Sequence, residues 1–138
     1  MAKFSLTLPY QTDLTDNHRL GRGRGGRTFL KKSVKEWQSH LAIRARNALN
    51  FKNLVLTPPV TIRISYFLPI GCTADVANFH KTIGDGLKRG VDIDDRYFRF
   101  VDEKVEYVKR SEARFVLRVS DAQEIEDVPE QFVGQMEW

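Results

Sequence analysis

Carboxylates stand at both ends of residues 72–95, a stretch whose residue types suit metal-assisted chemistry. Asp75 lies near its start, and Asp92, Asp94 and Asp95 close it. Carboxylates that cluster without basic partners repel one another unless a divalent cation neutralises them. Mg²⁺ prefers such oxygen ligands, and water and phosphate oxygens complete its coordination. The stretch therefore predicts a magnesium site at which Mn²⁺ would substitute. The alternative is that Asp75 only caps a helix and that the other acids are solvated helix ends.

The residues between these acids predict an amphipathic helix that begins near Asp75 and stops near Arg89-Gly90. Apolar side chains recur at helical spacing and would face the core: Val76, Phe79, Ile83 and Leu87. Polar side chains fall on another arc of the helix and would face solvent or a ligand: Asn78, Lys81 and Asp85.

The run from Asp75 to Lys81, DVANFHK, followed by Asp94-Asp95, resembles the RusA family of Holliday junction resolvases. That family has an Asp-x-Asp-Asn-x-x-Lys run and a later Asp-Asp. The resemblance covers about residues 4–119, more weakly at the amino end. It implies a Mg²⁺-dependent endodeoxyribonuclease that cuts four-way DNA junctions in recombination and repair and acts as a homodimer. It also implies a cytoplasmic protein of bacterial, prophage or phage origin.

Carried over residue by residue, the resemblance makes Asp75 and Asp95 metal-binding catalytic carboxylates and Lys81 the catalytic lysine, with Asp94 as a further possible ligand. One position departs from the family pattern, because Ala77 stands where the family has its second aspartate. We therefore expect this chain to be a very weak nuclease or an inactive one. Ala77 is explained either by an engineered substitution that traps a complex or by a natural loss of the aspartate. A non-catalytic junction- or nucleic-acid-binding protein is the alternative function, and an RNA-binding module is a third.

A basic, glycine-rich segment precedes the first helix and contains the run RLGRGRGGR. Guanidinium groups with few nearby acids suit phosphate oxygens, so residues 12–30 predict a mobile loop that contacts nucleic acid. A solvated linker is the alternative. The predicted DNA-binding residues of the loop and of the following helix start are Asn17, Arg19, Arg22, Arg24, Arg27, Lys31, Lys32 and Lys35.

Length and charge predict one domain with an appended tail. The chain has 138 residues, of which 41% are hydrophobic, enough for a single core. All 22 Lys and Arg precede residue 121, whereas residues 121–138 hold six acids. We therefore predict a basic domain at 1–120, where the resemblance implies the nuclease, and an acidic tail at 121–138. With no long apolar run, no membrane partner is expected. The single Cys72 excludes an internal disulfide, and the scattered histidines give no zinc-ligand spacing.

Alternating and helical patterns predict an α+β fold, a mixed β-sheet packed with helices in the order β-α-β-α-β-β. The strand at 3–8 ends at Pro9, and 53–59 connects the first helix to the second strand. Residues 96–101 are ambiguous, and one helical turn is an option there. The predicted segments are strands at 3–8 and 60–67, helices at 31–49 and from Asp75, and a hairpin of 104–107 with 114–119.

Overall fold

The computed structural model describes residues 2–121, and its regular elements form one α+β domain. The predicted acidic tail lies outside the described residues except for Asp121. In chain order the strands and helices are β1 (Lys3–Pro9), β2 (Leu20–Arg22), β3 (Thr28–Leu30), α1 (Lys32–Lys52), β4 (Val60–Pro69), α2 (His80–Val91), β5 (Phe98–Val108) and β6 (Arg114–Ser120). The predicted fold class and element order are confirmed, with the β2–β3 ribbon as an addition. Within residues 2–121, neither helix is long and apolar enough to cross a membrane.

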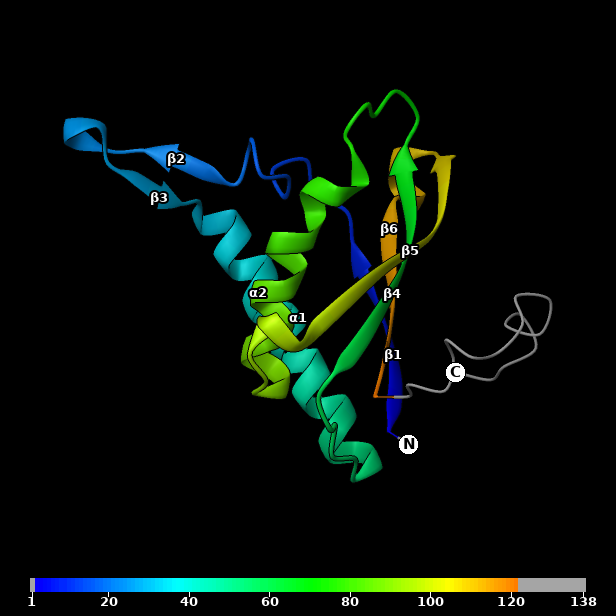
Figure 1. Cartoon of the computed structure of the whole chain (residues 1–138). Helices are drawn as coiled ribbons and strands as arrows, with labels where there is room; N and C mark the ends of the chain where they lie inside the picture. Colours follow the sequence, from blue (N-terminus) through cyan, green and yellow to red (C-terminus); the bar gives the residue numbers. More distant parts are fainter. Residues whose placement is uncertain (1, 122–138) are drawn as a thin grey trace.

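The main sheet is mixed, with the strand order β1-β6-β4-β5. β6 pairs antiparallel with both β1 and β4, while β5 runs parallel to β4. Both helices lie on one side of this sheet (Figure 1). Every residue of the central strand β4 is buried or half-buried, whereas β1 alternates buried Phe4, Leu6 and Leu8 with exposed residues. This difference follows from position, because β1 is an edge strand with one solvated face.

The predicted hairpin between residues 104–107 and 114–119 is wrong. β4 lies between β5 and β6, so the two strands are separated by a third and do not pair. Alternation shows that a segment is a strand with one buried face, but it does not say which strand lies beside it. The ambiguous segment is resolved as a short 3-10 helix, η3 (Asp95–Tyr97), that leads directly into β5.

The predicted basic loop contains a two-stranded ribbon of β2 and β3, joined by the 3-10 helix η1 (Arg24–Gly26). The ribbon projects from the amino end of α1, away from the main sheet (Figure 1). Three-residue strands interrupted by glycine give no readable alternation, which is why the sequence indicated only a loop. The mobility of the segment stays a prediction.

The two helices pack closely because α2 has glycines on the side that faces α1. A Cβ atom at Gly90 would lie 2.6 Å from the carbonyl oxygen of Ala42, and one at Gly86 would lie 2.8 Å from Leu41 Cδ2. A buried polar link adds specificity, since Gln38 Nε2 donates to the carbonyl oxygen of Thr82 (3.1 Å). Thr82 Oγ1 in turn donates to the carbonyl oxygen of Leu14 (2.7 Å). These contacts fix α2, and with it the predicted site residues, relative to α1 and the segment after β1.

We expect Gly90→Ala to lower the free energy of unfolding by about 1–3 kcal/mol, because the added methyl group meets rigid backbone atoms of α1. Gly84→Ala is the matched control, since its Cβ would approach only Phe100 Cζ, at 3.2 Å, the far end of a half-buried side chain. Its stability should stay within about 1 kcal/mol of wild type, helped by the better helix propensity of alanine. Urea unfolding measures both variants, and equal stabilities would contradict this packing.

Candidate active site

The predicted helix from Asp75 begins with a 3-10 helix, η2 (Val76–Phe79), which continues into α2. Asp75 caps this helix, because its Oδ1 accepts a hydrogen bond from the amide of Ala77 (3.1 Å). The cap interpretation is therefore correct for one carboxylate oxygen, and it leaves Oδ2 outside the capping contact. The predicted buried stripe is confirmed for Phe79, Ile83 and Leu87, while Val76 in η2 is half-buried.

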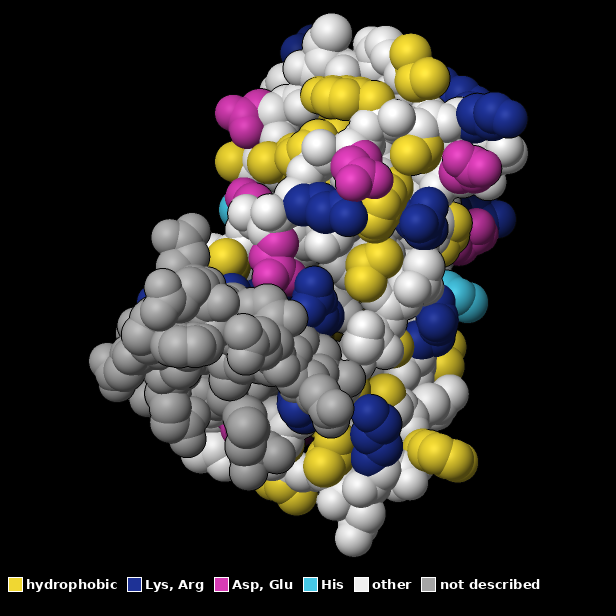
Figure 2. Space-filling model, turned by 90° about the vertical axis from the view of Figure 1, so that its right-hand side faces the viewer, with side chains coloured by type: hydrophobic (Ala, Val, Ile, Leu, Met, Phe, Trp, Pro, Cys, Tyr) yellow, Lys and Arg dark blue, Asp and Glu magenta, His cyan; other side chains and the backbone are white. Residues whose placement is uncertain are grey.

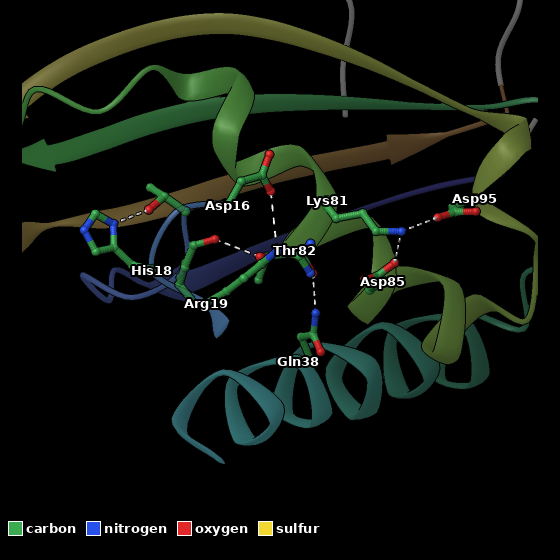
Figure 3. A network of polar contacts seen from close by, with 10 residues as sticks. Asp16, His18, Arg19, Gln38, Lys81, Thr82, Asp85 and Asp95 are labelled. Atoms are coloured by element: carbon green, nitrogen blue, oxygen red, sulfur yellow. Dashed lines mark hydrogen bonds and ion pairs between the residues drawn. The ribbon is translucent and has the colours of Figure 1, made fainter. Parts of the chain in front are cut away.

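Lys81 brings two acids from different elements together. Its Nζ lies 3.3 Å from Asp85 Oδ1, one turn along α2, and 3.9 Å from Asp95 Oδ2, at the start of η3 (Figure 3). All three side chains are partly exposed, so these ion pairs add little to stability and matter mainly by fixing positions. Lys81 and Asp95 are thus neighbours in space although 14 positions separate them in the sequence.

Asp94 and Asp92, the other acids after α2, have roles within their own turn of the chain. Asp94 accepts a hydrogen bond from the amide of Arg96 (3.0 Å) and forms an ion pair with its guanidinium. The amide contact is the largest cause that holds the pKa of Asp94 below its usual value. Asp92 adopts the left-handed conformation (φ 57°) that ends α2. A side-chain hydrogen bond with Asp95 also lowers the pKa of Asp94. No contact described for residues 2–121 joins Asp94 to Lys81 or Asp75.

Asp75 lies in a pocket of about 560 Å³ between the segment after β1 and the end of β4. Asn17, one of the predicted DNA-binding residues, lines the same pocket together with Asn78. A hydrogen bond from the amide of Asp16 to the carbonyl oxygen of Asn78 (3.1 Å) holds the two segments together. The structure therefore brings Asn17 to Asp75, and it brings Lys81 to Asp95.

The donor atoms fit a hard divalent cation in type but are few in number. Asp75 and Asp95 offer carboxylate oxygens, and the exposed methyl group of Ala77 offers none. Within residues 2–121, no group of three or more His, Cys, Asp or Glu side chains is arranged to hold a metal ion. Two carboxylates suffice for Mg²⁺ only where water and phosphate oxygens supply the other ligands. A divalent ion shared by Asp75 and Asp95 stays a prediction, because the contacts described for residues 2–121 join Lys81 to Asp95 but do not join Asp75 to Asp95.

A polar cluster beside this site was missed in the sequence. The Tyr66 hydroxyl donates to Asp102 Oδ1 (2.5 Å), and His80 Nε2 lies 2.9 Å from the same oxygen. The His80 ring also stacks on Phe100, with centroids 4.6 Å apart. Burial is the largest cause that raises the pKa of Tyr66, followed by the hydrogen bond and charge of Asp102 and the charge of Asp75. The three residues lie on three different elements and give no local signal in the sequence, where His80 is only one of three scattered histidines.

The predicted DNA-binding arginines lie mainly on the β2–β3 ribbon, where Arg22, Arg24 and Arg27 are exposed. Arg19 instead is half-buried and forms an ion pair with Asp16 (3.5 Å). At the start of α1, Lys31 is half-buried, and Lys32 and Lys35 are exposed. Lys32 forms a weak ion pair with Glu36. The side of the molecule remote from the ribbon instead shows Lys and Arg interspersed with Asp and Glu (Figure 2). The ribbon thus concentrates basic charge without acidic neighbours in its own strands.

Comparison with protein families matches residues 9–120 to Endodeoxyribonuclease RusA. The chain belongs to the RusA family. Members of this family are divalent-metal-dependent endodeoxyribonucleases that resolve Holliday junctions, and they act on branched DNA. The family resemblance stated from the residues is confirmed over nearly the whole predicted nuclease domain. A search of curated proteins found no match to the chain.

Ionisation of Tyr66 should couple to stability at high pH. Because its pKa is raised in the folded state, the unfolded chain loses this proton first, and wild-type stability falls as pH rises above about 10. Tyr66→Phe should be less stable by about 1 kcal/mol at pH 8, because Asp102 loses one donor. That deficit should shrink between about pH 10 and 11, as measured by thermal unfolding. Tyr107→Phe, at an exposed position, is the control, and a Tyr66→Phe deficit that stays constant would contradict the coupling.

Proposed function

We propose that this RusA family member binds four-way DNA junctions as a homodimer and cleaves them weakly or not at all in a Mg²⁺-dependent reaction. The observation that carries the proposal is the contact of Lys81 with Asp95, which unites two of the residues that the family motif assigns to catalysis. Asp75 lies at the other end of the same helical segment, in a pocket with Asn17. Mn²⁺ should substitute for Mg²⁺, because both accept oxygen ligands.

In this mechanism Asp75 and Asp95 would hold the divalent ion, and Asp94 would serve only if it left Arg96. A bound ion of this kind polarises a phosphate and lowers the pKa of an attacking water. Lys81 would donate hydrogen bonds to a phosphate oxygen as negative charge develops there. In the free protein Asp85 and Asp95 hold the lysine in position, so its ammonium group is already oriented when a phosphate arrives.

Ala77 is the reason to expect little activity. Its amide helps to position Asp75, but its side chain supplies neither charge nor a ligand. A missing carboxylate weakens metal binding, and every 1.4 kcal/mol of lost transition-state stabilisation lowers the rate about tenfold. DNA binding does not depend on position 77, because the basic ribbon lies on separate elements. Two strands must be cut to resolve a junction, and this requirement favours a two-fold symmetric dimer.

A non-catalytic junction-binding protein is the second candidate. The observation that favours it is that residues 2–121 contain no arrangement of three metal-ligating side chains. Under this alternative the remaining acids are structural, as Asp75 already is through its hydrogen bond to the amide of Ala77. Selection would then maintain only the affinity for branched DNA.

Restoring the carboxylate separates the two candidates. We expect Ala77→Asp to raise Mg²⁺-dependent cleavage of a four-way junction by about 100-fold or more, because it adds the third ligand. Ala77→Asn is the matched control of similar size without the charge, and it should give a much smaller gain. Gel assays of labelled junctions measure cleavage, and fluorescence anisotropy measures binding. Full junction affinity of Ala77→Asp without any cleavage would refute the nuclease proposal and favour the binding protein.

A further inference from the structure

An exposed aromatic ring lies on the basic ribbon. Phe29 in β3 pairs with Gly21 in β2, and its side chain is 50% exposed. A Cβ atom at Gly21 would come within 2.6 Å of Phe29 Cζ, and one at Gly23 within 3.6 Å of Cδ1. The ring therefore lies across the backbone of β2, where only a residue without a side chain leaves room for it.

Two arginines line the same pocket as this ring. Phe29, Arg24 and Arg27 line an open pocket of about 610 Å³ at the end of the ribbon, together with Gly23, Gly25 and Thr28. The chain turns back there through Gly25 and Gly26, which both have positive φ (71° and 76°). The pocket thus combines a flat apolar surface with two guanidinium groups, the pairing that recognises a nucleobase and its phosphates.

The ring is not explained by the core. The residues of η1 are all exposed, and Phe29 lies outside the hydrophobic core cluster and the apolar residues packed against it. The ring packs over Gly21 of β2, and about half of the side chain stays exposed to solvent. Aromatic rings presented in this way beside arginines typically stack with unpaired bases.

We propose that Phe29 is a stacking platform for a DNA base that is unpaired at the branch point, with Arg24 and Arg27 on the flanking phosphates. This inference rests on the proposed binding of four-way junctions. Base faces in a continuous duplex are covered by neighbouring pairs, whereas a branch point interrupts the stack and allows a base to swing out. The platform would therefore add selectivity for junctions over duplex, while the arginines would add affinity for both.

Binding of the full chain to an immobile four-way junction tests this proposal, without divalent metal and with 2-aminopurine at the branch point. We expect Phe29→Ala to weaken junction binding about tenfold or more and duplex binding by less than about threefold. The slope of affinity against salt should not change, because no charge is removed. The rise in 2-aminopurine fluorescence on binding, which reports that the base leaves its neighbours, should be lost.

Three further variants sharpen the test. Gly21→Ala keeps the ring but displaces it, so it should reproduce the Phe29→Ala defect. Phe29→Trp should retain junction preference, because indole stacks at least as well as phenyl. Phe51→Ala removes the 93% exposed phenyl group near the end of α1, remote from the ribbon, and should behave as wild type.

The outcomes separate this proposal from the proposed function. If wild type prefers the junction over duplex and Phe29→Ala keeps that preference, the platform is wrong and junction binding stands. If wild type shows no such preference, both proposals are overturned. A Phe29→Ala variant that sediments as a monomer while wild type is a dimer would show that the ring contacts a second copy, which overturns the platform. Replacing Arg22, Arg24 and Arg27 together should instead flatten the salt dependence on both DNAs.

Discussion

The position of Lys81 depends on Thr82, the residue that follows it on α2. Thr82 is fully buried, and its carbonyl oxygen accepts a hydrogen bond from Gln38 of α1 (Figure 3). Its Oγ1 donates to the carbonyl oxygen of Leu14, in the segment after β1. A buried polar group without a partner destabilises a protein by about 1–3 kcal/mol, so these contacts strongly favour one placement of α2. Gly90 allows the close approach that they require. These contacts thereby place Lys81 of α2 beside Asp95 of η3.

In the proposed function, the body formed by the main sheet and both helices serves cleavage, and the β2–β3 ribbon serves DNA binding. The body places Asp75, Lys81 and Asp95 on one helical segment and the turn that follows it. The ribbon carries exposed arginines that need no metal to attract a polyanion. Under the same proposal, a chain with Ala77 would lose cleavage and still bind DNA, because position 77 lies in η2 and not in the ribbon.

Sequence reasoning predicted the elements better than their partners. Alternation identified β1, β4 and β6, and helical spacing identified the buried stripe of Phe79 in η2 with Ile83 and Leu87 in α2. It failed where the outcome depends on tertiary contacts, as for β5, which pairs with β4 and not with β6. The Tyr66–Asp102–His80 cluster was invisible for the same reason. Only the family motif predicted that Lys81 lies near Asp95. The residue types alone are equally consistent with acids that are solvated at the ends of a helix.

The central claim is that Asp75 and Asp95 hold one divalent ion beside Lys81. Anomalous diffraction from crystals of the full chain with junction DNA and Mn²⁺ tests it most directly. The account predicts one anomalous peak within about 2.5 Å of a carboxylate oxygen of each aspartate, with a DNA phosphate completing the site. No peak at this site, or a peak bound by Asp94 with Asp75 turned away from it, would contradict the account.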